Sequence, residues 1–189
     1  MKSQLPACKS IEVVAFRGDR SGALGTAVLK ALDDEKKGRG VGPSLLECLL
    51  FAGHLGVSTN GSATVFAFNP DGGGIALWRL LEDLRNGAAF PGVVRDDTAV
   101  FVSARKRGHM LQSLEIVLPE PRFLDFERKL DGERRNSQYT YGFPDGDGDC
   151  NCITWLERMG LPLLTGRMAE FNSFPGIVAY PSRLFGVCV

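Results

Sequence analysis

The chain lacks a net charge, because its 22 Lys and Arg residues balance its 22 Asp and Glu residues. A protein without an overall field of one sign is not drawn to nucleic acid or to an anionic surface by long-range electrostatics. The local exception is the basic run Arg105-Lys106-Arg107, which could contact phosphate but is more typical of the solvated turn after a strand. We therefore expect no nucleic-acid partner.

Long hydrophobic runs are also missing. The longest, at residues 45–57, is interrupted by Glu47 and His54 and is too short to span a bilayer. The residues before Cys8 have the form of a lipoprotein cleavage box, but no apolar core of signal-peptide length precedes them. We expect no integral membrane segment, and a location in the cytoplasm or export without a conventional signal peptide.

Disulfide pairing is not expected either. Five cysteines is an odd number, and 189 residues with 44% hydrophobic content can build a core without covalent staples. The spacing of Cys150 and Cys152 is too tight for an ordinary disulfide or for a zinc pair. The sequence thus indicates one domain over residues 1–189 with reduced thiols, and no internal repeat.

Hydrophobic periodicity predicts a mixture of helices and strands, which makes the fold class α+β. The expected strands are residues 11–16, the second half of 45–58, and residues 64–68, 98–104 and 114–118. The expected helices are residues 23–32, 75–86, 121–130 and 153–159. The glycine-rich, charged residues 33–42 are expected to form a loop.

Histidine is scarce, which narrows the choice of a general base. His54 lies in an apolar strand between glycines, whereas His109 follows the basic run. We favour His54. A buried imidazole needs a polar partner to fix its tautomer, and Asn69 on the neighbouring strand is the candidate for this catalytic role. The sequence Asn-Pro-Asp-Gly that begins at Asn69 is equally typical of a turn, and Asn60 is a less favoured alternative.

Cys152 is the candidate nucleophile, because it follows a possible N-cap, Asn151, at the start of a helix. A helix N-terminus and a nearby imidazole both lower the pKa of a thiol, and the free N–H groups of the first turn could bind an oxyanion. Cysteine is also often a small buried residue without chemistry. Cys150 is the rival nucleophile, expected still in the preceding loop.

Three aspartates, Asp145, Asp147 and Asp149, alternate like the opening of an EF-hand loop. Cys150 stands where that loop needs glycine, and Leu156 where it needs glutamate. We expect a turn rather than a calcium site, and we predict no metal and no cofactor.

Three short motifs resemble the circularly permuted papain-like superfamily of cysteine hydrolases. Residues 53–57 (Gly-His-Leu-Gly-Val) are similar to its histidine strand, and residues 66–70 to the strand that supplies the orienting residue. Residues 151–155 (Asn-Cys-Ile-Thr-Trp) are similar to its nucleophile helix. This resemblance, over residues 45–165, implies a small antiparallel sheet packed against the helix that carries Cys152, with His54 facing the thiol. No Gly-x-Ser-x-Gly elbow of a serine lipase occurs.

The superfamily includes bacterial cell-wall peptidases and amidases and the lecithin:retinol acyltransferase group. The resemblance therefore implies a cysteine peptidase or amidase, with a peptide or muropeptide as substrate and an acyl-enzyme intermediate. Two alternatives stay open. One is an acyltransferase or lipid esterase that uses the same Cys-His dyad, and the other is a non-catalytic papain-like domain that acts as an effector or binding module.

Overall fold

The computed structural model describes residues 8–18, 22–109, 111–142 and 148–161. In chain order the elements are β1 (Cys8–Arg17), α1 (Ala23–Lys36), α2 (Leu45–Ala52), β2 (Gly53–Thr59), β3 (Phe66–Pro70), α3 (Leu77–Arg85), β4 (Phe90–Asp96), α4 (Thr98–Lys106), β5 (Leu111–Pro119), α5 (Glu120–Arg135), β6 (Thr140–Tyr141) and α6 (Cys152–Arg158).

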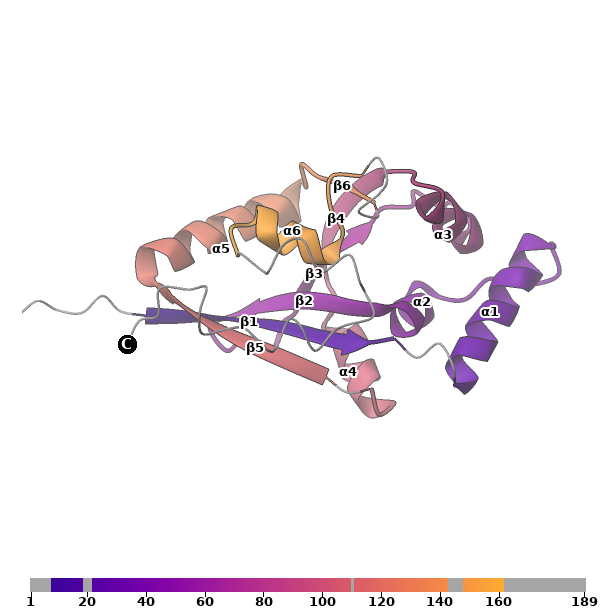
Figure 1. Cartoon of the computed structure of the whole chain (residues 1–189), viewed down its shortest axis with the longest axis horizontal. Coiled ribbons are helices and arrows are strands. Elements are labelled where there is room, and N and C mark those ends of the chain that lie inside the picture. Colours follow the sequence, from indigo (N-terminus) through magenta and orange to yellow (C-terminus); the bar gives the residue numbers. More distant parts are fainter. Residues whose placement is uncertain (1–7, 19–21, 110, 143–147, 162–189) are drawn as a thin grey trace, which may run out of the picture.

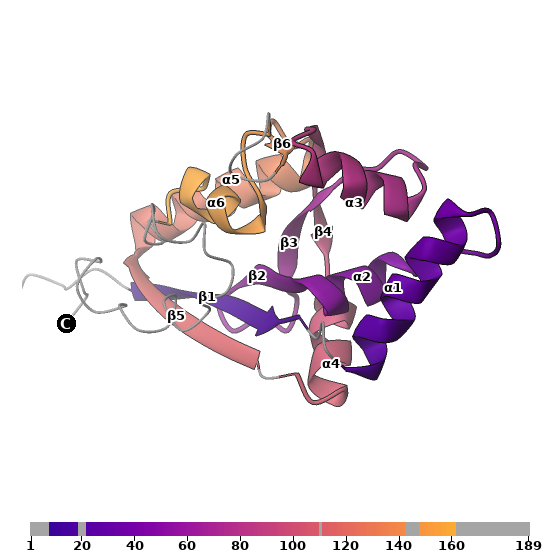
Figure 2. The same cartoon turned by 45° about the vertical axis from the view of Figure 1, so that its right-hand side comes forward.

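The described strands form one six-stranded sheet in the order β5-β1-β2-β3-β4-β6, and neighbouring strands are antiparallel. Helices α5 and α6 lie on one side of this sheet and α4 lies on the other (Figure 1). The view in Figure 2 shows the same division, with α1, α2 and α3 gathered at one end of the molecule. The fold is therefore α+β, as the hydrophobic pattern predicts.

Alternating side chains of the strands divide the core between the two faces of the sheet. Along β1, Val13 and Ala15 pack with residues of α5 and α6, whereas Val14 and Phe16 pack with residues of α2 and α4. Helix α6 packs on β2 and β3. The helix that begins with Cys152 thus sits over the middle of the sheet.

Most of the predicted elements are confirmed, and one is wrong. Residues 98–104, expected as a strand because of their β-branched content, form the helix α4. Val100, Phe101 and Ala104 recur with helical spacing and are buried, while Val102 is 47% exposed. Asp96 accepts hydrogen bonds from the backbone N–H and the hydroxyl of Thr98 and so supports the first turn. Burial of this stripe outweighs the local β preference.

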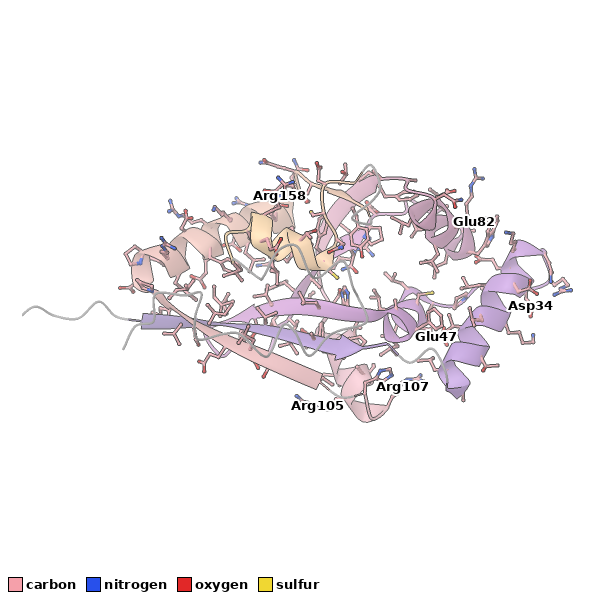
Figure 3. All side chains as sticks on the ribbon, in the orientation of Figure 1. Asp34, Glu47, Glu82, Arg105, Arg107 and Arg158 are labelled. Atoms are coloured by element: carbon pink, nitrogen blue, oxygen red, sulfur yellow. The ribbon has the colours of Figure 1, made fainter. Side chains whose placement is uncertain are left out.

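Three further differences concern charged or irregular segments. The helix α1 extends to Lys36, beyond its expected end, and residues of the predicted loop close its last turn. Glu82 of α3 lies beside α1 and accepts a hydrogen bond from Lys36 (Figure 3). Strand β4, which contains Pro91 and Gly92, was not expected. The basic run follows a helix rather than a strand, with Arg105 and Arg107 at the end of α4 (Figure 3).

Candidate active site

His54 is placed by an abrupt change from helix to strand. Gly53 ends α2 with φ of 88°, a left-handed conformation that glycine adopts without strain, and β2 begins at the same residue. Gly56 then allows close packing, because a Cβ there would lie 2.9 Å from the carbonyl oxygen of Phe66. The side chain of His54, the second residue of β2, is buried. Its ring stacks on Phe101 of α4 at 5.9 Å between centroids.

Cys152 is placed by the cap of α6. The side-chain oxygen of Asn151 accepts the backbone N–H of Thr154 at 3.0 Å, and the hydroxyl of Thr154 accepts the backbone N–H of Asn151 at 2.9 Å. This reciprocal pair is a capping box in which threonine replaces the usual glutamate. The predicted cap at Asn151 is confirmed, and Cys152 is the first residue of the helix and is buried.

The structure brings Cys152 and His54 together. The side chain of Cys152 is a hydrogen-bonding partner of the His54 ring. The other side of the ring meets a carboxylate, because Nε2 of His54 lies 2.8 Å from Oδ2 of Asp97. With Nε2 occupied in this way, Nδ1 is the ring nitrogen left for the thiol. The three side chains form a connected line from sulfur through imidazole to carboxylate.

Asp97, which the sequence reasoning missed, reaches the ring because it does not cap its own helix. It occupies the N-cap position of α4, yet its carboxylate makes no capping hydrogen bond there. Asp96 supports the helix start instead, because its carboxylate accepts a hydrogen bond from the backbone N–H of Thr98. The backbone N–H of Asp97 is held by the carbonyl of Val65 at 2.9 Å, so its buried side chain points toward β2. Two successive aspartates precede the start of α4, but no local signal in the sequence tells which of them turns toward the imidazole.

Asn69, the predicted orienting residue, lies at the site but one step further from the thiol than expected. Continuing the antiparallel register of Val57 with Phe66 places Asn69 opposite His54. Its amide nitrogen donates to Oδ2 of Asp97 at 2.7 Å and to the carbonyl oxygen of Ala67 at 3.2 Å. The group that directly contacts the imidazole is thus Asp97, and Asn69 contacts that carboxylate.

Cys150, the rival nucleophile, is buried beside the site without meeting the base. It forms a bridge with Tyr141, and its thiol points to the carbonyl of Thr140 with an S–O distance of 4.0 Å. Burial, followed by the nearby carboxylate of Asp149, raises the pKa of Cys150 to about 12. This thiol is therefore protonated at neutral pH, and the sulfur that hydrogen-bonds His54 is that of Cys152. Among the described residues, Cys48, Cys150 and Cys152 are free thiols.

Tyr141 is the second site residue that the sequence reasoning did not single out. Its side chain hydrogen-bonds both the side chain and the backbone of Cys152, and its ring lies 5.5 Å from that of Phe68. Burial raises the pKa of Tyr141 well above its usual value, and the sulfur of Cys152 raises it further. The phenol therefore keeps its proton at neutral pH and can donate a hydrogen bond next to the thiol.

The surroundings of His54 favour its charged form. Burial lowers the pKa of His54, but the hydrogen bonds to Asp97 and Cys152 outweigh this effect and raise the pKa to about 9. An imidazolium beside a thiol stabilises the thiolate. The arrangement places the charged imidazole of His54 between the sulfur of Cys152 and the carboxylate of Asp97.

This shift predicts how stability depends on pH. A group with a higher pKa in the folded chain stabilises the fold below its unfolded pKa, and this contribution is lost as the pH rises through the folded value. For His54 the window runs from about 6.5 to about 9. We expect the free energy of unfolding of a Cys152→Ser variant, in which no thiol at the site titrates, to fall as the pH rises through this window, because the hydrogen bond to Asp97 still raises the pKa of His54. Urea titrations at pH 6, 7.5 and 9 measure this. Adding His54→Gln to this variant should make the change much smaller, and equal changes in the two proteins would contradict the assignment.

Comparison with known proteins gives no match. No family model, curated protein sequence or solved structure matches the chain. Among the described residues no helix is both long and apolar enough to cross a membrane. Within the same ranges no cluster of His, Cys, Asp and Glu side chains is suited to hold a metal ion. Asp145 and Asp147 of the alternating aspartates lie outside them, and Asp149 accepts hydrogen bonds from Thr140.

Proposed function

We propose that the chain is a cysteine hydrolase in which Cys152 is the nucleophile, His54 the general acid and base, and Asp97 the residue that orients and charges His54. The observation that carries this proposal is the buried line of hydrogen-bonding contacts from Cys152 through His54 to Asp97. A nucleophile, a base within its reach and a third group that holds the base are the parts that acyl transfer needs.

The reaction has two halves. The thiolate of Cys152 attacks the carbonyl carbon of an amide, and the imidazolium of His54 gives its proton to the leaving amine, which leaves a thioester on the sulfur. The neutral imidazole of His54 then takes a proton from a water molecule as its oxygen attacks the thioester carbon, the C–S bond breaks, and the carboxylic acid product leaves. Cys152 is thereby returned as the thiolate beside the imidazolium of His54. Tyr141, which contacts both the sulfur and the backbone of Cys152, is placed to donate to the developing oxyanion.

The proposed substrate class is peptides, including muropeptides. The permuted papain-like resemblance supplies this class, and the antiparallel sheet that packs against the cysteine helix is compatible with it. The order along the chain agrees as well, because the histidine strand comes first and the cysteine helix follows late. The permuted papain-like fold and cleavage of peptide amides are both parts of the proposal.

The nucleophile can be tested without knowing the substrate. Iodoacetamide at pH 6, followed by peptide mass spectrometry, should alkylate Cys152 at least about tenfold faster than Cys150 or Cys48, because only a thiolate reacts. Replacing Cys152 with alanine should remove the fast phase, and Cys150→Ala is the matched control that should keep it. Fast labelling of Cys150, or no fast phase in the wild-type protein, would contradict the assignment of Cys152 as the nucleophile.

The reaction itself is tested by acyl-enzyme trapping. The protein is mixed at pH 6 with a panel of peptides, muropeptides and lipid esters and quenched with acid within seconds. Intact-mass analysis should then show a peptidyl or muropeptidyl adduct in the wild-type protein and none in Cys152→Ala. An adduct formed only with lipid esters would favour the acyltransferase or esterase alternative.

A further inference from the structure

We propose that Asn69 is a positioning residue that keeps the carboxylate of Asp97 on His54 and away from the N-terminus of α4. This inference rests on the proposed function, because it concerns the same three side chains. Asn69 acts through Asp97 and is not placed in contact with the thiol or with substrate.

The first step in the argument is that a single oxygen of Asp97 receives both contacts. Oδ2 accepts the amide of Asn69 at 2.7 Å, and the same oxygen lies 2.8 Å from Nε2 of His54. The two donors approach from β3 and from β2. A carboxylate oxygen held by two donors on different strands cannot rotate away from either one without breaking a hydrogen bond.

The second step concerns the direction of the Asn69 amide. Both partners of its nitrogen, the carboxylate of Asp97 and the carbonyl of Ala67, are acceptors, so the NH2 group must face them. This orientation of the amide leaves its oxygen unpaired, because Oδ1 of Asn69 is buried without a hydrogen-bond partner. An unpaired buried acceptor is unfavourable. The chain tolerates it here in exchange for a donor aimed at Asp97.

The third step is that Asp97 has an attractive alternative. Aspartate at an N-cap usually turns its carboxylate onto the free N–H groups of the first helical turn. Asp97 occupies that position on α4 yet makes no such bond. Removing the donor of Asn69 would therefore leave the carboxylate free to turn from His54 toward the start of α4, and His54 would lose the charge that raises its pKa. The titratable groups that face His54 are Asp97 and Cys152. Tyr141 and Cys150 lie next to Cys152.

The experiment is a double-mutant cycle with alkylation of Cys152 by iodoacetamide at pH 6.5 as the readout. Asn69→Leu keeps the volume and removes the donor, and we expect the rate to fall about tenfold, with the midpoint of the pH profile moved upward. In an Asp97→Ala background the same change should alter the rate by less than twofold, because no carboxylate remains to be positioned. Thermal melting checks that each variant is folded, and Asn69→Ala, which also lacks the donor, replaces the leucine variant if that one is not.

Two results would overturn the inference. One is a wild-type rate and pH profile in Asn69→Leu, and the other is an equal loss in both backgrounds, which would mean that Asn69 only supports packing. Failure of the proposed function has a different signature. It would show in the two proteins that retain Asn69. Either Cys152 of the wild type would be labelled slowly, or the Asp97→Ala variant would react as fast as the wild type.

Discussion

Replacing Asp97 with asparagine should reduce kcat/KM for an amide substrate by roughly 10⁴-fold, the loss known for the same change in a serine-protease triad, and should slow the alkylation of Cys152 at pH 6. The substitution removes charge but little else. Both hydrogen bonds to Asp97 arrive at one oxygen, so the carbonyl oxygen of an asparagine can occupy that place and accept from Asn69 and His54 as before.

Without the negative charge of Asp97, burial has more weight in setting the pKa of His54. Burial is the largest influence on the pKa of His54 and acts to lower it, and the hydrogen bond that the ring donates to Asp97 is the first influence that opposes it. In Asp97→Asn we expect the pKa of His54 to fall from about 9, because only the contacts with Cys152 remain to oppose the effect of burial. The imidazole would then be less charged at neutral pH and would stabilise the thiolate less.

The measurements are the alkylation rate between pH 5 and 9 and the NMR titration of the His54 ring. Asp96→Asn is the matched control, because Asp96 is the adjacent carboxylate but bonds Thr98 instead of His54. It should change the rate by less than twofold while weakening the start of α4. If Asp97→Asn retained the wild-type rate and the His54 titration did not move, Asp97 would have no part in activating the thiol.

Replacing Trp155 with alanine should destabilise the fold by about 3–5 kcal/mol, the range for removing a large aromatic side chain from a core. Trp155 is fully buried, and its ring stacks on Phe68 with 5.7 Å between centroids and 11° between planes. It is also the contact that seats α6 on the sheet, one turn after Cys152. We therefore expect the loss of stability to be accompanied by slower alkylation of Cys152.

Urea unfolding at pH 6 measures the first effect. Trp155→Phe should cost much less, since it keeps an aromatic ring and removes an indole N–H that has no partner. Leu124→Ala is the surface control, because Leu124 on α5 is 48% exposed, and its effect should stay within about 0.5 kcal/mol. A change below about 1 kcal/mol in Trp155→Ala would show that α6 contributes little to the core.

The residues with local signals were predictable from the sequence. The two glycines around His54, the hydrophobic runs of β1 and β5, and the cap of α6 at Asn151 each reflect short-range geometry, and the structure contains them. Strand β4 escaped prediction because Pro91 and Gly92 interrupt its pattern, and because its neighbour β6 is too short to stand out.

The site was only half predictable for a related reason. Cys152 and His54 are distinguished by residue type and by the elements that carry them. Asp97 is one of many aspartates, and it differs from Asp96 only in which way its side chain turns. That direction follows from tertiary contacts with β2 and β3. Asn69 was placed near the ring by strand pairing, but the carboxylate between the two could not be inferred from the sequence.

The order of these residues along the chain has a consequence for biosynthesis. A ribosome delivers His54, Asn69 and Asp97, with all six described strands, before it delivers Cys152 in the last described helix. The growing chain can thus assemble the imidazole–carboxylate half of the site while no thiol is yet beside it. Reactive sulfur would arise only when α6 docks on the sheet, after nearly all of the described fold has left the ribosome.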